Sequence, residues 1–528
     1  MNTPLKQVLA TLGFLSAGLC ARGAAAPEAP SEWVDPATGH VIVRLSKEAP
    51  SASMYFHQNG YTPDGKKLLI FTPQGMSTVD LQTHQIDVLV PGFRPLSMSM
   101  SNGIEVSHKE PVVYYNQTMD GENVLIAMNM YTHEWKKAAV LPPGATLGGI
   151  TADESMVIGI RNIGGGRGAG AAPPTIGTPT SPFPETPRGS GAPTNPTRGT
   201  PTNPGRGTPT SPTAQTPTNP GPGTPRSPTA QTPTALRPQT PATPAAAGAR
   251  GGAGGQSKQI YTVNLKTGET KSFFPSEDNL SHDNLNHFET SPTDPKLMLF
   301  AHEGNWATLE RIWTMRADGT NLKLMHVRSM QNEIAGHEFF SRDGKWVYYD
   351  LQTPESGVFW IGGANVETGE HVRYPILRSE WSVHFNVSWD GKVFSGDGGG
   401  PNSVANRDPV TNAHFNPPQN GQWMYLFTPT GEFTTMDVNG EKVKVGKLTT
   451  EKLADLRKHD YGNGEPTRVE PNATFTPDDK WLTFRSNMEG ALHVYEVEIA
   501  RATPDEIKRI DGEWAAYKAA GGTTPQPK

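Results

Sequence analysis

Three histidines stand at the same position of a repeated sequence unit. His337 and His384 each precede the aspartate of an Asp-Gly turn by six residues, and His287 matches them if its turn carries one extra residue. They lie 50 and 47 residues apart along the chain. Because equivalent positions of a repeat fold to equivalent places, we expect the three imidazoles to converge on one site.

Imidazole titrates near neutral pH and is a common ligand of Mn, Fe and Zn ions, so this pattern predicts metal binding or acid–base catalysis. A single histidine at such a position is better explained by a hydrogen bond to a neighbouring unit, whereas three in phase favour a functional site. The same phase also holds Gln58, Leu147 and Asn472, and His302 lies nearby in an Ala-His-Glu-Gly sequence. We take Gln58, His302 and Asn472 as candidate substrate contacts.

Other polar features receive a structural interpretation. His57, His414 and His459 have no evident partner in the sequence, and we interpret them as surface or packing residues. The glycine-rich stretch Ser395-Gly-Asp-Gly-Gly-Gly-Pro is interpreted as a turn between strands. Tryptophan and tyrosine at alternating strand positions are interpreted as packing between units rather than as platforms for sugars.

The elements that must position the histidines are short strands. A polar turn, a strand of aliphatic and aromatic residues and a strand ending in Thr-Gly or Asp-Gly recur every 40 to 50 residues or so, which is typical of a propeller. Turns near seven residues indicate an all-β, seven-bladed β-propeller: Asp64, Glu110, Asp153, Asp294, Asp343, Asp390 and Asp478. We expect His40 to Leu45 to close the ring as an outer strand of the last blade.

The chain divides into four kinds of segment. Residues 1–26 have the basic, apolar and small-residue regions of a signal peptide, so we expect an exported protein, periplasmic or secreted. Residues 27–163 and 257–503 form the predicted propeller, and residues 504–528 form a C-terminal tail. Residues 164–256, rich in Gly, Pro, Thr and Ser, predict a disordered insertion in the third blade.

Composition excludes several classes of function. The 528-residue chain has a net charge of -6 and no long basic run, which argues against nucleic-acid binding. No stretch of the mature chain is apolar enough to predict a membrane span. The single cysteine, Cys20, lies in the signal peptide after Leu19, which disfavours lipidation, and its removal excludes disulfides and thiolate chemistry. The oligomeric state is left open.

Seven phrases spread along the mature chain together resemble the oligogalacturonate lyase family. They are Trp33-Val-Asp-Pro-Ala-Thr-Gly-His, Tyr55-Phe-His-Gln-Asn, Ser291-Pro-Thr-Asp-Pro, Ala301-His-Glu-Gly, Ala335-Gly-His-Glu-Phe-Phe, Trp381-Ser-Val-His-Phe-Asn-Val-Ser and Val469-Glu-Pro-Asn-Ala-Thr-Phe-Thr-Pro-Asp. The resemblance implies a seven-bladed propeller that binds an acidic oligosaccharide, with a divalent metal, Mn first, held by histidines in the central channel.

The resemblance also implies roles for single residues. His337 and His384 match the metal histidines, and His287 matches the catalytic base. Arg311 is available as the family's catalytic arginine. Near His384 the family has further histidine and glutamine ligands, where this sequence has Ser379, Trp381, Ser382 and Asn386.

The implied reaction is a β-elimination in pectin fragments. A cation beside the uronate carboxylate stabilises the charge that develops when His287 removes the C5 proton, and the product is a 4,5-unsaturated sugar. Three alternatives remain: a non-catalytic periplasmic binding propeller, a lyase for another uronate, and a propeller-capped serine peptidase. The peptidase is disfavoured because the chain has no Gly-x-Ser-x-Gly sequence.

Overall fold

The computed structural model describes residues 27–94, 103–163, 257–275, 285–462 and 469–527. Within these ranges the chain forms 29 strands, two 3-10 turns and one α-helix, which confirms an all-β protein. No helix in these ranges is long and apolar enough to cross a membrane. The predicted signal peptide and the insertion at 164–256 lie outside the described residues.

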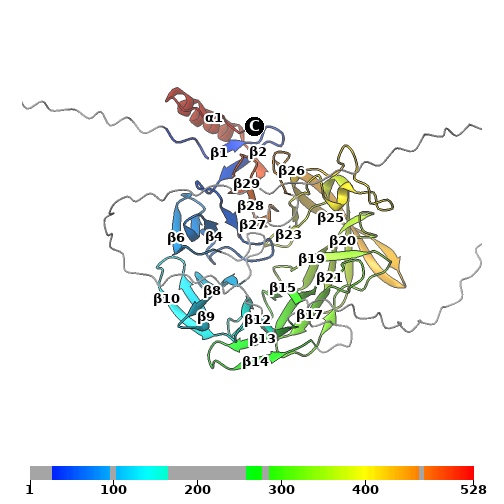
Figure 1. Cartoon of the computed structure of the whole chain (residues 1–528). Helices are drawn as coiled ribbons and strands as arrows, with labels where there is room; N and C mark the ends of the chain where they lie inside the picture. The colour runs from blue at the N-terminus through cyan, green and yellow to red at the C-terminus, as the bar shows by residue number, and fades with distance from the viewer. Residues whose placement is uncertain (1–26, 95–102, 164–256, 276–284, 463–468, 528) are drawn as a thin grey trace, which may run out of the picture. The chain divides into compact units, whose positions relative to one another are not determined.

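Consecutive strands pair antiparallel into sheets that follow one another around the propeller (Figure 1). The four-stranded sheets contain β3 (Ala52–Ser53), β4 (Lys67–Thr72), β5 (Gly75–Asp80) and β6 (Ile86–Pro91); β7 (Ile104–Val106), β8 (Val112–Met119), β9 (Glu122–Asn129) and β10 (Trp135–Val140); β11 (Ala145–Ile150), β12 (Met156–Ile163), β13 (Ser257–Asn264) and β14 (Thr270–Phe273); and β15 (Leu285–Thr290), β16 (Leu297–His302), β17 (Ile312–Arg316) and β18 (Lys323–Leu324).

One sheet has eight strands, which differs from the prediction of seven separate blades. Its strands, in spatial order, are β19 (Ile334–Phe340), β20 (Trp346–Gln352), β21 (Phe359–Asn365), β22 (His371–Ile376), β26 (Glu441–Asp455), β25 (Trp423–Val438), β24 (Phe394–Gly396) and β23 (Phe385–Val387). The parallel β22–β26 pairing joins its two halves at only two residue pairs, Val372 with Lys444 and Arg373 with Val445. The β25–β26 hairpin is long enough to extend past its own half and reach β22, so the described residues form six sheets.

The last sheet joins the two ends of the described chain. It contains β1 (Glu32–Val34), β2 (His40–Arg44), β29 (His493–Arg501), β28 (Trp481–Ser486) and β27 (Thr474–Phe475), in this order. The antiparallel pairing of β2 with β29 confirms the predicted closure by His40 to Leu45. Such closure pairs strand edges that an open sheet would expose.

The repeated turns connect the innermost strand of a sheet to the second strand of the same sheet. In five turns a Ser or Thr hydroxyl donates to the aspartate two residues later at 2.6 to 2.8 Å, and backbone amides of the turn bond to the same two side chains. These local bonds stabilise the turn by themselves, as Ser, Thr and Asp side chains do elsewhere. The Pro-Asp-Gly pattern in the sequence therefore marks real strand connections.

Apolar side chains fill the spaces between successive groups of strands. The described residues form seven buried apolar clusters, and most of them combine residues from two neighbouring strand groups, while one also includes residues of α1. Phe56, Phe339 and Phe385, for example, share one cluster although three different inner strands or loops supply them. The apolar core thus lies between neighbouring sheets, and the innermost strand of each sheet lines the centre of the propeller.

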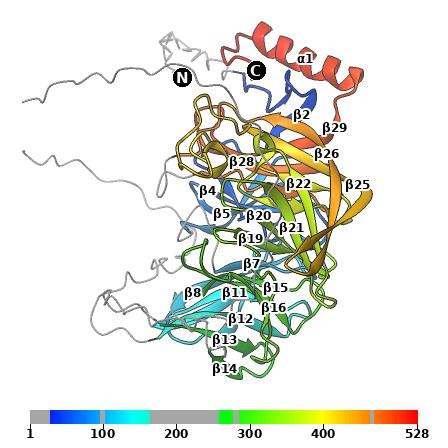
Figure 2. The same ribbon diagram turned by 90° about the vertical axis from the view of Figure 1, so that its right-hand side faces the viewer.

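The C-terminal segment, expected as a tail, forms α1 (Pro504–Ala519). Thr503 caps its first turn, and its side chain accepts from the amide of Glu506 while Glu506 reaches back, as in a capping box. Ile510, Trp514 and Tyr517 are buried, and the indole of Trp514 donates to the Glu32 carbonyl at 2.8 Å. Figure 1 shows α1 beside β1, and Figure 2 shows α1 next to β2 from the other direction.

Candidate active site

His287 and His337 owe their orientation to the same irregularity in their inner strands. In β15, His287 and Phe288 together oppose one residue of β16, and in β19, His337 and Glu338 oppose one residue of β20. Both histidines have left-handed backbone, with φ of 48° and 50°. Bulges re-aim side chains, and left-handed backbone in residues other than glycine is uncommon and gathers at functional sites.

The three predicted histidines lie in one cluster with Tyr55 and Phe56. The Tyr55 ring lies 5.6 Å from the ring of His287 and 5.1 Å from that of His384, centroid to centroid. The rings of His337 and His384 are 4.9 Å apart, and Phe56 stacks on His384 at 4.4 Å. The structure thus brings the three histidines of one repeat phase into one cluster.

His384 is held by a buried carboxylate. Its Nδ1 lies 2.8 Å from Oδ2 of Asp397, and its backbone amide donates to Oδ1 of the same residue at 2.8 Å. Its Nε2 faces the Tyr55 hydroxyl at 3.1 Å and the Glu470 carboxylate at 3.6 Å. His384 and Asp397 are almost fully buried. An acceptor at Nδ1 favours the tautomer whose Nε2 carries the lone pair, which is the arrangement found behind many metal-bound histidines.

His287 faces a short loop between β16 and β17. Its Nε2 lies 3.8 Å from Oε1 of Glu303, while Oε2 of Glu303 pairs with Arg311 at 2.6 Å. Burial lowers the pKa of His287 to about 3, and Arg311 acts in the same direction while Glu303 opposes it. His287 is therefore a neutral imidazole over the ordinary pH range, which is the form that can accept a proton.

Arg311 is a buried cation between two acids. Besides Glu303 it contacts Glu338, whose Oε2 lies 3.3 Å from its Nε, and its guanidinium lies 4.0 Å from the centre of the Trp306 ring. Burial alone would lower the pKa of Arg311, but Glu338 and Glu303 outweigh it and raise the pKa. Its Nη2 is buried without a hydrogen-bond partner among the described residues, so one donor face is uncommitted.

His57, interpreted from the sequence as a surface or packing residue, packs inside the cluster. Its ring lies 5.2 Å from that of Tyr55 and 6.0 Å from that of His287. Burial lowers its pKa well below the usual value, with His287, His384 and Arg342 adding to the effect. A cavity of about 30 Å³ lies against it, lined also by Glu289 and Arg342, and this is room for about one water molecule.

The remaining predicted residues occupy different places. Gln58 donates to the Ile104 carbonyl of the next sheet, and His302 is buried at the end of β16. Asn472 is fully buried: its backbone amide donates to Asp397 and its side chain accepts from the Phe56 amide. The structure thus places Asn472 against Asp397 and Phe56, which both contact His384. It places Arg311 beside Glu303, which faces His287.

Four residues of the cluster were not selected from the sequence. Tyr55 and Glu303 each lie in a phrase that carried the family resemblance, and Trp306 follows closely after Glu303. Asp397 lies in the glycine-rich stretch that was interpreted as a turn, and it is the aspartate side chain there that contacts His384. For Tyr55 and Glu303 the usable signal was a phenol or an acid inside a phrase that carried the resemblance, outside the phase of the histidines.

The resemblance found in the sequence implies a divalent metal, and the histidine pair fits such an ion in part. Within the described ranges, no three His, Cys, Asp or Glu side chains are arranged as a metal shell. His337 and His384 nevertheless lie with their rings 4.9 Å apart, and Asp397 directs Nε2 of His384 into the cluster. The neighbours that replace the family's extra ligands are engaged within the protein, since Trp381 donates to Asp350 and Asn386 donates to the Phe56 carbonyl.

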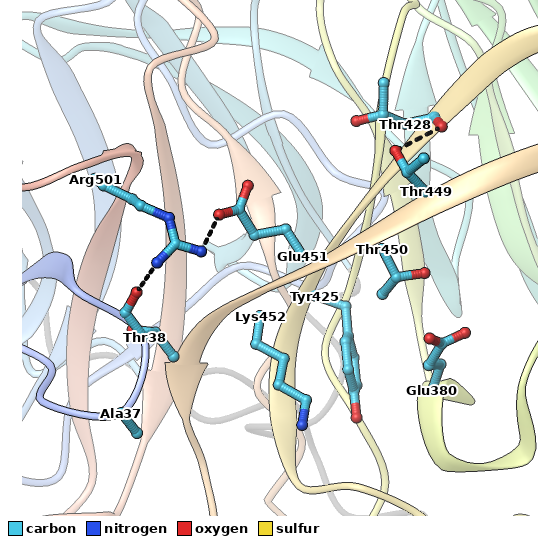
Figure 3. A pocket seen from close by; sticks show the side chains of 10 residues that line it. All are labelled: Ala37, Thr38, Glu380, Tyr425, Thr428, Thr449, Thr450, Glu451, Lys452 and Arg501. Atoms are coloured by element: carbon cyan, nitrogen blue, oxygen red, sulfur yellow. Dashed lines mark hydrogen bonds and ion pairs between the residues drawn. The ribbon is translucent and has the colours of Figure 1, made fainter.

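A larger groove elsewhere offers less chemistry. It has a volume of about 520 Å³ and lies between the turn after β1 and the strands β25, β26 and β29 (Figure 3). Arg501 reaches across it to Glu451 at 2.6 Å and to the Thr38 carbonyl at 2.7 Å, so that cation is already engaged. No histidine lines this groove. The histidine cluster is the better candidate for a catalytic site.

Comparisons with known proteins agree on one family. Residues 256–503 match the family model described as oligogalacturonate lyase. The chain is 23% identical over 254 residues to an oligogalacturonide lyase of Pectobacterium atrosepticum and 22% identical over 250 residues to an oligogalacturonate lyase of Dickeya dadantii. Each match covers 47% of this chain and 56% of the relative, so the chain spans about half the length of the curated relatives it matches.

Two solved structures share the fold. One is an oligogalacturonate lyase in complex with manganese, 19% identical, with a TM-score of 0.56 over 89% of this chain and 96% of that one. The other is an oligogalacturonate lyase from Vibrio parahaemolyticus, 17% identical, with a TM-score of 0.56 over 90% of this chain and 99% of that one. At these identities the likeness establishes the propeller fold.

Proposed function

Residues 256–503 belong to the oligogalacturonate lyase family, and on this premise we propose that the protein cleaves short oligogalacturonides by β-elimination. The observation that carries the proposal is the convergence of His287, His337 and His384, from three groups of strands, beside the buried guanidinium of Arg311. A binding propeller has no need of a neutral buried imidazole next to an uncommitted cation. An enzyme that removes a proton alpha to a carboxylate needs both.

The reaction begins with the substrate carboxylate. Removing the C5 proton of a uronate places a second negative charge on the group formed by C5 and its carboxylate, so a cation must offset that charge. Arg311 supports this role because Nη2 is uncommitted and Glu303 and Glu338 hold the rest of the guanidinium in place. His287 takes the proton as general base, and the C4–O4 bond breaks to leave a 4,5-unsaturated uronate.

A divalent ion, Mn first, is part of the proposal. The solved relative that contains manganese supports it, and His337 and His384 are the residues of this chain that would hold the ion. When bound, such an ion supplies positive charge to the substrate carboxylate. Asp397 fixes the ring of His384 and the Tyr55 hydroxyl lies 3.1 Å from its Nε2, so the chain itself orients that imidazole.

The test is an ultraviolet assay for unsaturated uronates with purified protein, added Mn²⁺ and a panel of short uronate oligomers. We expect product from di- and trigalacturonides. Product only from another uronate, such as glucuronate linked to rhamnose, would assign a different lyase on the same scaffold. Binding of oligomers without any product would identify a binding module and reject the proposal.

Two further proposals concern the whole chain. We propose that the two halves of the eight-stranded sheet are separate blades, which gives seven in total; the two-pair junction and the seven apolar clusters support this count. We also propose that residues 1–26 direct export and are then removed. Mass spectrometry of the protein from the periplasm or medium tests this, with a mature chain that starts at or near Pro27 as the expected result.

A further inference from the structure

Glu303 occupies a position between the proposed base and the buried cation. One of its carboxylate oxygens, Oε2, is held by Arg311 at 2.6 Å and receives the Trp306 indole N–H at 3.3 Å. The other, Oε1, points to Nε2 of His287 at 3.8 Å. The side chain of Glu303 is only 17% exposed, and that of His287 is 7% exposed. The carboxylate is thus fixed at one oxygen and presented to His287 by the other.

The two nitrogens of His287 have different surroundings. Nε2 has the Glu303 carboxylate as its nearest acid, whereas Nδ1 is buried and has no hydrogen-bond partner among the described residues. A neutral imidazole carries its single proton on the nitrogen that has an acceptor, which leaves the lone pair on the other. A distance of 3.8 Å needs to shorten by about 1 Å to become a hydrogen bond, and catalytic bonds are often long before substrate binds.

We infer that Glu303 is a positioning residue that holds His287 with its proton on Nε2, so that Nδ1 is the atom that takes the C5 proton of the substrate. This inference rests on the proposed function. In the reaction the C5–H electron pair forms the C4=C5 bond, the C4–O4 pair leaves on O4, and water protonates that oxygen. Nδ1 of His287 keeps the C5 proton until solvent removes it, and Glu303 faces the imidazolium that exists in the meantime.

The loop that carries Glu303 is packed so as to keep this geometry. Trp306 lies with its ring 5.2 Å from that of His337, and a side chain in place of Gly336 would meet the Trp306 ring at 2.6 Å. Trp306 also lies against Arg311, which contacts both Glu303 and Glu338. Two carboxylates therefore contact one guanidinium, and Oε1 of Glu303, which Arg311 does not contact, faces His287.

The experiment combines spectroscopy with kinetics on the full-length protein. Histidine labelled with ¹⁵N gives ring-nitrogen shifts that distinguish the two tautomers, and the His287 signals are assigned by their absence in His287→Ala. We expect the wild-type His287 to be protonated on Nε2. We expect Glu303→Gln to change the His287 tautomer populations and to lower kcat about 10- to 100-fold, with KM changed less than about 3-fold, because a neutral amide supports an imidazolium poorly.

Two controls separate this role from a general loss of structure. Glu310→Gln alters an acid of the same loop that pairs with Arg328, and we expect unchanged kcat and tautomer signals. Glu338→Gln removes the other acid on Arg311, and we expect the His287 signals to stay as in wild type. Glu303→Asp, which keeps the charge, should retain more of kcat than Glu303→Gln.

The possible failures can be told apart. If wild-type His287 is protonated on Nδ1, the inference is overturned, and this result does not depend on the folding of any Glu303 variant. If His287→Ala is inactive while Glu303→Gln has wild-type kcat, the inference is also overturned but the proposed base stands. If His287→Ala turns over normally, the proposed base itself is wrong. In the double variant of His287→Ala and Glu303→Gln we expect the same kcat as in His287→Ala alone, because Glu303 acts through His287.

Discussion

His384 depends on Asp397 for its orientation, and at the scale of single residues this dependence is the simplest to test. Asp397 accepts from the His384 amide, from the Asn472 amide and from Nδ1 of His384. In Asp397→Asn one acceptor becomes an N–H₂ donor that faces other donors. We expect activity or Mn²⁺ affinity to fall about 10- to 100-fold, and the free energy of unfolding to fall by about 1 to 3 kcal/mol.

The measurements are kcat/KM, metal titration and denaturant unfolding. Asp437→Asn, on the exposed β25–β26 hairpin, is the matched control and should behave as wild type in activity. An Asp397→Asn variant with normal activity and normal metal affinity would mean that the orientation of His384 is irrelevant to the reaction.

Replacing either proposed metal histidine should remove metal and activity together. In His337→Ala and His384→Ala a small ligand set loses one imidazole, so we expect bound Mn²⁺, measured by elemental analysis after reconstitution, to drop with turnover. His414→Ala, at an exposed position, is the control. Full metal content in both variants, or none in the reconstituted wild type, would refute the assignment.

Replacing the proposed base should have a different result. We expect His287→Ala to keep its bound metal and to lose turnover by about 100- to 10,000-fold, which is the usual contribution of a positioned base. The comparison with His337→Ala is informative because both residues occupy the same kind of strand bulge. Normal turnover in His287→Ala would show that another group removes the C5 proton.

The repeat phase predicted which histidines meet but not what supports them. His287, His337 and His384 share a phase, and a repeat converts shared phase into proximity. Tyr55, Asp397 and Glu303 lie outside that phase and reach the cluster through loops and through contacts between distant parts of the chain. Such contacts depend on how neighbouring sheets pack, and a sequence of short strands does not reveal that packing.

At the scale of elements, the turns were the most predictable feature because their bonds are local. Each Ser or Thr and its aspartate are two residues apart and form their bond without help from the rest of the fold. The β22–β26 pairing was not predictable, since the length of a hairpin does not say which strand its far end will meet. The segment predicted as a C-terminal tail forms α1, because Thr503, Pro504 and Glu506 stabilise its first turn and its apolar face packs against β1.

The insertion is joined to the propeller in a way that makes it separable. β12 and β13 pair along their whole length, from Met156 with Asn264 to Ile163 with Ser257, so the chain leaves and returns at adjacent positions. We expect a variant in which Asn-Gly replaces residues 164–256 to keep its activity and to melt within about 3 °C of wild type, because a two-residue turn suits paired antiparallel strands. A large fall in melting temperature would show that the tract contributes to the propeller's stability.

At the scale of the whole molecule, closure concentrates ionisable groups in buried places. Burial raises the pKa of Glu105 and Glu496 to about 8 and that of Asp350 to about 7. Burial also lowers the pKa of His287 to about 3 and that of His108 and His459 to about 4. The folded state therefore keeps all six groups neutral over a pH range in which the unfolded chain ionises them.

The two sets affect stability in opposite directions. The acids have folded pKa values above the unfolded ones of 3.8 to 4.5, so the stability they contribute is complete at low pH and is lost as the pH rises toward 8. The histidines have folded pKa values below the unfolded 6.5, so their stability is complete at high pH and is lost as the pH falls toward 3. Between about pH 4.5 and 6.5 the two trends oppose each other.

We therefore expect the free energy of unfolding to be greatest near pH 5 to 6 and to decline on both sides. The alkaline decline should be most evident between about pH 6.5 and 8, because over this range the unfolded histidines lose their remaining protons and no longer oppose it. Urea unfolding at half-unit pH steps measures this profile. Glu105→Gln should flatten the alkaline decline, because the amide removes one of the groups that the folded state must ionise. A free energy that rises steadily from pH 6 to pH 8 would contradict the prediction, since it would require buried acids that gain stability on ionisation.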